Sequence, residues 1–312
     1  MEDVACAICG KKSEKPWVIV KDGTYGIPGE FTLIKCSFCG LVYLSPRPTQ
    51  KEMEAYYPKD YIPHIRSVSG IEGMFPVAGK IFYLGKRFFL GYDPLLGFLK
   101  KGTALEIGCG SGLYLKSLMQ KGWEAYGVDV SPLAVQYAKQ LGIRVHLGEL
   151  TEAQFKDGFF GVVLCMGALG HIHNPSALLR EVRRIIRGDG YLIVTLPNIA
   201  GIEARIFKEA YWNGKDIPRQ LYFFTPETLE NLLRKNGFYV KRKFFFGFIS
   251  SRSLYIALPY HMKKTWYAHV LNNHLIYYLT AVLTYPLMVL ASKIFHKGPL
   301  MAIHAVIGPL DE

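Results

Sequence analysis

Along the middle of the chain, segments alternate between two patterns of apolar residues. Short apolar runs between glycines or polar residues predict strands, whereas apolar residues that recur every three or four positions predict helices. The expected strands span, in chain order, residues 103–107, 124–128, 144–147, 161–166 and 191–196. Helices are expected at 112–121, from Ser131-Pro132 to about Gln140, and from Asn174-Pro175 onward, with a turn at 187–190. This alternation predicts an α/β fold with a doubly wound parallel sheet.

The last quarter of the chain adds two strands and a long apolar stretch. Strands are expected at 239–246 and 299–307. Between them, residues 265–292 carry no formal charge, a length that could cross a bilayer, and they include several aromatic residues. Pro286 interrupts this stretch, and because proline breaks a helix, a hairpin of two shorter helices is expected. The hairpin either lies on the cytoplasmic leaflet of a membrane or packs on protein, within the domain or in a dimer.

Composition and charge place the chain among basic globular proteins. The 312 residues are 50% hydrophobic and 20% charged, which excludes a disordered or fibrous chain and allows one large domain with a small one. The formal net charge is +12, and no acidic residue lies between Glu230 and Asp311. A basic surface attracts nucleic acid or anionic lipid, and the neighbouring apolar runs favour lipid. The first residues lack the basic and apolar regions of a signal peptide, so a cytoplasmic location is expected.

Two matching cysteine pairs near the N-terminus predict a metal site. Each pair is C-x-x-C followed by glycine, which accepts the left-handed backbone of a turn that directs amides toward the sulfurs. The four residues are Cys6, Cys9, Cys36 and Cys39. Four thiolates suit a closed tetrahedral zinc site with no open position for chemistry. A structural zinc is the main interpretation, with redox cysteines and a ribbon that recognises nucleic acid or a protein partner as its alternatives.

The loop after the first strand of the sheet predicts a cofactor. It reads Glu106-Ile-Gly108-Cys-Gly110-Ser-Gly112-Leu113, and it lacks both the dinucleotide glycine spacing and the lysine of a phosphate loop. Glycines at alternate positions let the backbone pass close to a ligand. Glu106 is then expected to face an ammonium group of that ligand. Asp129, at the tip of the second strand, can accept hydrogen bonds from both hydroxyls of a ribose. A ligand with an amino-acid tail and a ribose, but no phosphate, is S-adenosylmethionine.

These motifs together resemble the class I S-adenosylmethionine-dependent methyltransferases, and more narrowly the branch with an N-terminal zinc-binding segment. Beyond the cysteines and the glycine loop, the resemblance covers residues 40–48, 56–57, 127–129, 147–149, 171–175, 188–190, 196–198, 221–229 and 237–238. It implies a Rossmann-like sheet of seven strands, mostly parallel, whose last strand runs antiparallel between the fifth and the sixth. It also implies methyl transfer from S-adenosylmethionine.

The resemblance assigns individual residues to the cofactor. The residues implied to bind it are Glu106, Gly108, Gly110, Gly112, Asp129, Glu149, Met166 and Gly167. In this family the position of Glu149 contacts the adenine amino group. Met166 and Gly167, which end the fourth strand, line the cofactor cleft.

The acceptor side is less closely defined by the resemblance. His171 faces the substrate and is the candidate catalytic residue, although Gly170 and Gln220 stand where the family often has an acid and a histidine. By position alone, further candidates for a base are His173, Tyr211 and Tyr222. Residues 202–224 are expected to form either a lid over the acceptor or an exposed connection.

Four domains are expected from these observations. They are a zinc-ribbon-like segment (1–48), a helical, basic and aromatic linker (49–100), an S-adenosylmethionine-binding methyltransferase domain (101–260 and 297–312) and an apolar helical insertion (261–296). The expected function is methylation of a small-molecule, glycan or lipid-linked acceptor by a protein peripheral to an anionic membrane surface. The alternatives are a nucleic-acid methyltransferase, disfavoured because residues 165–171 lack the motif for base amino-methylation, and a non-catalytic zinc-clipped scaffold. Methylation at oxygen, carbon or nitrogen is open at this point.

Overall fold

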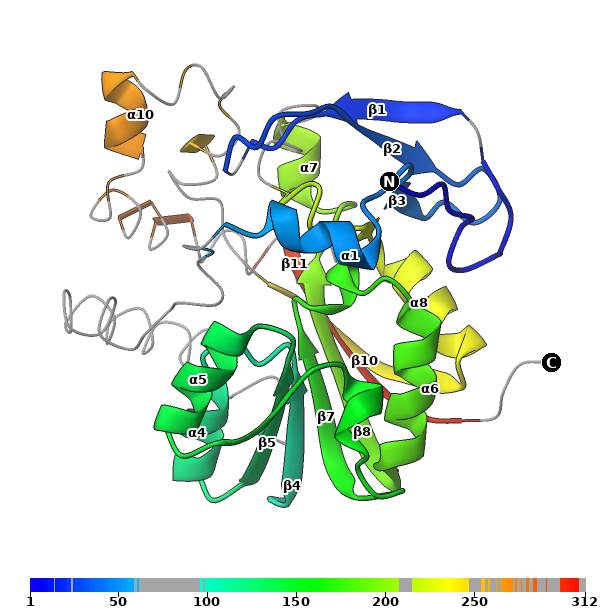
Figure 1. Ribbon diagram of the computed structural model, residues 1–312, viewed down its shortest axis with the longest axis vertical. Coiled ribbons are helices and arrows are strands. Elements are labelled where there is room, and N and C mark those ends of the chain that lie inside the picture. Colours follow the sequence, from blue (N-terminus) through cyan, green and yellow to red (C-terminus); the bar gives the residue numbers. More distant parts are fainter. Residues whose placement is uncertain are drawn as a thin grey trace. The chain divides into compact units, whose positions relative to one another are not determined.

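The structure is a computed structural model of the chain (Figure 1). It describes residues 1–13, 15–23, 25–58, 61, 96–97, 99–207, 215–246, 254–255, 258, 262, 265–271, 273, 276, 279–280, 283–284, 290 and 298–308. The chain divides into two compact units, which are described in turn. The first unit comprises Met1–Pro58, Pro197–Asn231 and Phe244–Met301, and the second comprises Lys59–Leu196, Leu232–Lys243 and Ala302–Glu312. The expected domain boundaries stay predictions, and most of the expected linker lies outside the described residues.

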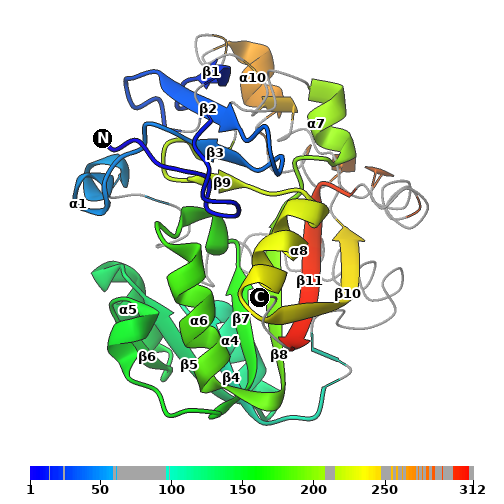
Figure 2. The same ribbon diagram turned by 90° about the vertical axis from the view of Figure 1, so that its right-hand side faces the viewer.

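The larger sheet has seven strands in the order β10-β11-β8-β7-β4-β5-β6 (Figure 2). The strand bounds are β4 Thr103–Ile107, β5 Glu124–Asp129, β6 Arg144–Leu147, β7 Phe160–Met166, β8 Ile186–Pro197, β10 Phe238–Phe246 and β11 Leu300–Ile307. The pairs β4–β5, β5–β6, β4–β7 and β7–β8 are parallel. The chain moves outward from β4 through β5 to β6 and then returns to the other side of β4. In open α/β sheets, ligands bind at the carboxyl ends of the strands beside such a switch point.

The last strand, β11, inserts between β8 and β10, as the sequence predicted. The amide of Asn198, just past the end of β8, donates to the carbonyl of Pro299, just before β11, at 2.8 Å. At the opposite end of β11, the amide of Gly308 donates to the carbonyl of Gly237, just before β10, at 3.0 Å. The start of β11 therefore meets the end of β8, and its end meets the start of β10. This strand runs antiparallel to both neighbours (Figure 2).

The helices that follow these strands are α4 Leu113–Gln120, α5 Pro132–Gln140, α6 Pro175–Ile185 and α8 Pro226–Lys235, and the short 3₁₀ helices are η3 Leu150–Ala153 and η4 Leu169–His171. Of these helices, α5 and α6 begin where the sequence placed them, and α4 begins one residue later than expected. The predicted caps of α5 and α6 are confirmed. The Ser131 side chain accepts from the Ala134 amide at 3.3 Å, and Asn174 accepts from the Ala177 amide at 3.0 Å. These side chains satisfy amides that have no partner inside the helix.

The expected turn at 187–190 is not separate from the fifth strand. β8 begins at Ile186, directly after α6, and the four residues lie within the strand as an irregularity. Phe160 of β7 pairs with Ile186, whereas Val162, two residues on, pairs with Tyr191. The two glycines in the sequence suggested a turn outside the sheet, but the backbone folds back within the ladder, so the predicted strand start at 191 is wrong.

The core of the larger sheet consists of side chains with no exposed area. The central strands supply Leu105, Val162, Val163, Leu164, Ile193 and Val194 to this core. A parallel strand that is covered on both faces has apolar residues at consecutive positions rather than at alternate ones. This explains why β7 reads as a continuous apolar run.

The first unit contains a four-stranded sheet in the order β1-β2-β3-β9. The strand bounds are β1 Pro16–Val20, β2 Phe31–Lys35, β3 Val42–Leu44 and β9 Tyr222–Phe223, and all three pairs are antiparallel. The helices of this unit are α1 Gln50–Met53, η1 Glu54–Tyr56, α7 Ile202–Phe207 and α10 Trp266–Leu271. The cysteine-bearing segment thus forms a hairpin and a third strand, to which a strand from far along the chain is added.

The charge-free apolar stretch is described only in part. Its described portion includes α10, and Trp266 at the start of this helix is exposed. Among the residues that the structure describes, every helix is too short or too polar to cross a bilayer. Half of residues 265–292, Pro286 included, lies outside the described residues.

Candidate functional site

The glycine loop connects β4 to α4 in the second unit, at the carboxyl edge of the sheet. Gly108, Gly110 and Gly112 have φ angles of 68°, 53° and 76°, a left-handed region that favours glycine. The amides of Gly108 and Cys109 both donate to the carbonyl of Val128 at the end of β5, at 2.8 and 3.2 Å. These bonds fix the loop against the neighbouring strand.

Two of these glycines are required by close contacts within the protein. A Cβ on Gly108 would lie 2.7 Å from the Cβ of Ala168, in the loop after β7. A Cβ on Gly112 would lie 2.4 Å from Ile143 Cδ1 and 3.0 Å from Ala138 Cβ. Gly112 therefore permits α4 and α5 to pack, a role independent of any ligand, and its contact with a cofactor stays a prediction.

Asp129 holds the glycine loop through both of its carboxylate oxygens. Oδ2 accepts from the Gly110 amide at 2.8 Å, and Oδ1 accepts from the Ser131 amide at 2.9 Å. The side chain is only 7% exposed. Each carboxylate oxygen has two lone pairs, so further hydrogen bonds from ribose hydroxyls are compatible with this arrangement. The sequence did not predict that this residue also anchors the loop.

Glu106 is a buried carboxyl group without a counter-charge in the part of the chain that the structure describes. It lies in β4, is 4% exposed, and its Oε2 has no hydrogen-bond partner among the described residues. Burial, and secondarily the charge of Asp129, raises the pKa of Glu106 to about 8. An ammonium group beside this carboxyl would supply both the missing donor and the missing charge. The residue therefore fits the amino-acid end of S-adenosylmethionine.

The other predicted cofactor residues lie after the neighbouring parallel strands, at the same edge of the sheet. Glu149 precedes η3, where its amide donates to the Glu152 carboxylate at 2.7 Å, and its side chain is exposed. Met166 ends β7 and is half-buried. Gly167 follows with a φ of 81° and donates to the carbonyl of Thr195 in β8 at 2.8 Å. This placement agrees with a crevice across β4, β5 and β7, while the individual contacts with a cofactor stay predictions.

The candidate catalytic residue lies just beyond this edge. His171 ends η4 and is half-buried, and its amide donates to the carbonyl of Ala168 at 2.9 Å. The same segment therefore holds Ala168 against Gly108 and places His171 after β7. A role for His171 in proton transfer stays a prediction.

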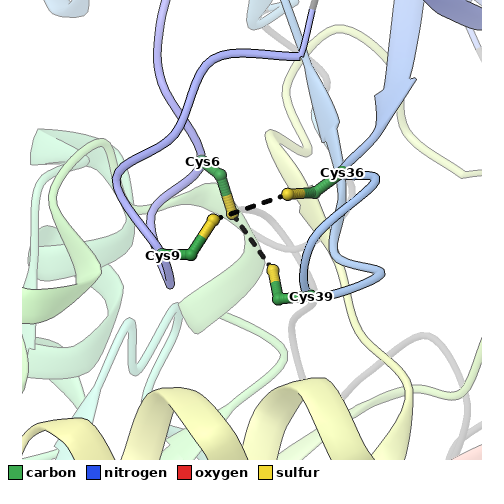
Figure 3. Close-up of side chains that lie close together, drawn as sticks. All are labelled: Cys6, Cys9, Cys36 and Cys39. Atoms are coloured by element: carbon green, nitrogen blue, oxygen red, sulfur yellow. Dashed lines mark hydrogen bonds between the residues drawn. The ribbon is translucent and has the colours of Figure 1, made fainter.

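In the first unit, the four N-terminal cysteines converge (Figure 3). Their Sγ atoms all lie within 4.8 Å of one another, with 3.3 Å between Cys6 and Cys39 and 3.5 Å between Cys9 and Cys36. Zinc–sulfur bonds of about 2.3 Å in a tetrahedron require sulfurs about 3.8 Å apart. The cluster therefore has the donor set and spacing of a closed four-cysteine metal site.

The two cysteine turns have the same backbone geometry. The amides of Gly10 and Gly40 donate to the carbonyls of Cys6 and Cys36, at 2.8 and 2.9 Å, and both glycines have positive φ. The first turn is buried, which raises the pKa of the Cys6 thiol. At Cys36, burial acts in the same direction, but the amides of Cys39 and Phe38 outweigh it and lower the pKa to about 6. The turns thus provide the amide donors that stabilise thiolates.

Sequence reasoning missed a buried arginine that joins distant parts of the first unit. Arg219 has no exposed area, and its guanidinium donates to Asp22 at 3.0 Å, to Asp216 at 2.8 Å and to the Tyr56 carbonyl at 2.8 Å. It also lies over the Tyr25 ring, 4.7 Å from the centroid. Arg219 and Asp22 are almost two hundred positions apart, and no sequence motif links them, so this cluster could not be predicted from the sequence.

The end of the expected lid belongs to the cysteine-bearing sheet. Tyr222 pairs with Tyr43 in the β3–β9 ladder, is 3% exposed, and accepts from Arg47 Nη1 at 2.8 Å. Burial raises its pKa. The expectation that residues 202–224 form a lid or an exposed connection is therefore wrong for β9, and Tyr222 is a structural residue. Tyr211 lies outside the described residues.

Comparison with known proteins agrees with this geometry. Residues 84–243, just over half of the 312-residue chain, match the family model described as "Methyltransferase domain". The chain belongs to this family. The matched region contains β4 to β8, the glycine loop, Glu106, Asp129 and His171. The predicted class I methyltransferase fold is therefore confirmed, with its seven strands and its antiparallel last strand.

Individual relatives of the methyltransferase domain are more distant. "Ubiquinone biosynthesis O-methyltransferase" of Pseudomonas paraeruginosa is 31% identical over 103 residues, which are 31% of this chain and 44% of that protein. The protein of the same name from Nitrosomonas europaea is 26% identical over 113 residues, 34% of this chain and 48% of that protein. The chain thus spans about half the length of these relatives. A solved methyltransferase from Archaeoglobus fulgidus, described as SAM-dependent, has a TM-score of 0.48 and 20% identity, covering 75% of this chain and 97% of that one.

Proposed function

We propose that this protein is an S-adenosylmethionine-dependent methyltransferase that acts on a small-molecule acceptor. The observation that carries the proposal is Glu106, a buried carboxyl group beside a glycine loop, with an oxygen that has no hydrogen-bond partner among the described residues. An ionised carboxylate kept out of water is costly without a counter-charge, so Glu106 favours its protonated form until a cation binds beside it. Membership of the methyltransferase domain family supports the same cofactor.

Each predicted cofactor residue has a specific role in this proposal. Glu106 holds the ammonium group, and the loop glycines allow the backbone to approach the amino-acid tail. Asp129, already held by the amides of Gly110 and Ser131, accepts from the ribose hydroxyls. Glu149 receives the adenine amino group, and Met166 and Gly167 form the wall beside it. The cofactor supplies a methyl group on a sulfonium, which leaves behind a neutral thioether.

The protein's contribution to the reaction is chiefly alignment of the acceptor. A neutral leaving group needs no proton, so proximity and orientation can lower most of the barrier. A base is required only if the acceptor is an un-ionised hydroxyl or a carbon acid. In this proposal His171, which ends η4 after β7, would accept such a proton.

The nature of the acceptor is inferred from the relatives and from the charge pattern. The relatives named as ubiquinone biosynthesis O-methyltransferases support a small molecule methylated at oxygen. The acid-free, basic stretch of residues 231–310, with its apolar segment, supports an acceptor at an anionic membrane surface, such as a lipid-linked compound or glycan. The protein would then be peripheral to the cytoplasmic leaflet.

A structural zinc completes the proposal. The four cysteine sulfurs leave no position for a substrate, so the metal would fold the N-terminal segment and take no part in methyl transfer. The buried Arg219 cluster would join that folded segment to residues 215–223.

Labelled S-adenosylmethionine identifies the acceptor class directly. We expect transfer of the labelled methyl group to a compound in a membrane-lipid or small-molecule extract, and none to RNA. Asp129→Ala should abolish transfer, because it removes the ribose acceptor and releases the loop. Asp157→Ala is the matched control, since this exposed acid only pairs with Arg184 and should leave transfer unchanged. Label in RNA alone, or in no fraction, would contradict the proposal.

A further inference from the structure

The outer side of α6 borders a cavity that is separate from the cofactor loop. Its volume is about 590 Å³, within the usual range for small-ligand pockets. The lining residues are Ser176, Arg180, Arg183, Arg184, Lys235 and Asn236, all in the second unit. Four of these six residues are cationic, and none is aromatic or aliphatic.

The periodicity of α6 places its arginines on the side away from the sheet. The buried residues of this helix are Pro175, Leu178, Leu179, Val182 and Ile185. Ser176 and Arg180 are four positions apart, and Arg183 and Arg184 follow three and four positions later, which is the spacing of one helix face. Lys235, the last residue of α8, adds its ammonium group from a second element.

Positive charge exceeds negative charge around the cavity. Arg184 pairs with Glu181 and Asp157, so its charge is balanced. Arg183 donates from Nη2 to the Gly308 carbonyl at 3.1 Å, which uses one donor but leaves its charge without a carboxylate in any described contact. Arg180 is exposed at the cavity.

Neutral hydrogen-bonding groups form the rest of the wall. Asn236 is 5% exposed, and its Nδ2 donates to the Leu232 carbonyl at 2.8 Å and lies 3.4 Å from Ser176 Oγ. The amide is therefore fixed by α8 on one side and α6 on the other. The Ser176 hydroxyl, which accepts from Asn236, keeps its own proton for a ligand.

We propose that this cavity binds a phosphate-bearing anion. A phosphate ester carries up to two negative charges and several acceptor oxygens, which match the guanidinium groups of Arg180 and Arg183 and the ammonium of Lys235. None of the described lining residues is an aromatic residue on which a nucleobase could stack, so we expect recognition of the charged group rather than of a ring. The α6 cavity would bind an anion, whereas Glu106 would bind a cation. The proposed anion site does not depend on methyl transfer.

Inorganic pyrophosphate is the probe for this site. Isothermal titration at low ionic strength should show saturable binding that weakens as salt is added. Arg180→Gln and Lys235→Gln should each weaken binding by about tenfold or more, the usual effect of losing a hydrogen bond to a charged group. Lys139→Gln, which removes an exposed cation from α5, is the matched control and should leave binding unchanged. Binding of S-adenosylmethionine should be the same in all three variants.

Two arms of the experiment separate the sources of phosphate. If a sugar phosphate competes with pyrophosphate for the site, and the protein does not sediment with phosphatidylglycerol vesicles, the natural ligand is a soluble phosphate ester. If the wild-type protein sediments with these vesicles and Arg180→Gln does not, the ligand is a phospholipid headgroup. Absence of saturable pyrophosphate binding, or equal weakening by Lys139→Gln and Arg180→Gln, would overturn the proposal. Because cofactor binding is measured in parallel, either failure is distinguishable from failure of the methyltransferase proposal.

Discussion

At the scale of single residues, the candidate site contains a buried carboxyl group whose pKa is raised. Glu106 is buried, has no cationic partner in the described contacts and has a pKa raised to about 8 by burial and by Asp129. At pH 7 this carboxyl is therefore mostly protonated before a ligand binds. An arriving ammonium group would displace the proton, so binding and ionisation are coupled.

The glycine loop gives a prediction about packing. Gly112→Ala should lower the free energy of unfolding by at least about 2 kcal/mol. Alanine would be held at a left-handed φ that it disfavours, and its Cβ would collide with Ile143. Gly142→Ala is the matched control, since Gly142 has a φ of 77° and nothing within 4 Å of its Cβ position, so it should cost about 1 kcal/mol. Denaturant unfolding measures both values. Equal losses would show that α4 and α5 do not pack through Gly112.

His304 gives a prediction about pH. It lies in β11 without exposed area, and burial, followed by the nearby charge of Arg242, lowers its pKa from 6.5 to about 4. The unfolded chain therefore binds a proton between pH 6.5 and 4 that the folded chain does not bind. Stability should fall as the pH decreases through this window, by up to about 3 kcal/mol, and this contribution should be constant above pH 6.5. Urea unfolding of the wild type and of His304→Leu should show a smaller pH slope in the variant, and equal slopes would contradict the assignment.

At the scale of elements, the sequence predicted the helix starts that depend only on neighbouring residues. α5 and α6 begin at the expected caps because Ser131 and Asn174, each followed by proline, satisfy the first amides without help from the rest of the fold. β9 was not predictable, because two residues form a strand only by pairing with β3, far away in the sequence. Arg219 was missed for the same reason: its partners come from three separate segments.

The candidate site was predictable in its residues but not in all of their contacts. The alternating glycines and the acids in β4 and β5 identified the loop, and the structure places them at one edge of the sheet. The sequence could not reveal that Asp129 holds the loop or that Gly112 serves the packing of two helices. Both facts depend on distances across the fold rather than on spacing along the chain.

The cysteine-bearing sheet gives a prediction about metal content. Purified protein should contain about one zinc ion per chain, and Cys36→Ser should lose it, because four thiolates are needed to close the site. Loss of zinc should also expose the hairpin β1–β2 to proteolysis, since its fold would lose the metal bonds. Cys165→Ala, a buried cysteine in β7, is the control that should retain the ion. Metal analysis that finds no zinc in the wild-type protein would contradict a structural zinc site.

At the scale of the whole molecule, the chain combines an excess of positive charge with two buried acids. The net charge of +12 and the arginines of α6 attract anions, whereas β4 and β5 of the larger sheet carry two buried acids, Glu106 and Asp129. A cationic protein with buried acids at its proposed cofactor site can approach anionic surfaces and still accept a ligand that carries a sulfonium and an ammonium. The proposed enzyme needs both properties if its acceptor lies at a membrane.

Calorimetric titration with S-adenosylmethionine tests the central claim most directly. The wild-type protein should bind one equivalent, release a proton at pH 7, and bind more tightly as the pH rises toward 8, as Glu106 ionises. Glu106→Gln should weaken binding by about ten- to a hundredfold and abolish the proton release, because the charged partner of the ammonium is lost. Glu124→Gln, an exposed carboxylate in the adjacent strand, should leave both unchanged. Absence of binding by the wild type, or equal affinity in Glu106→Gln, would contradict the account.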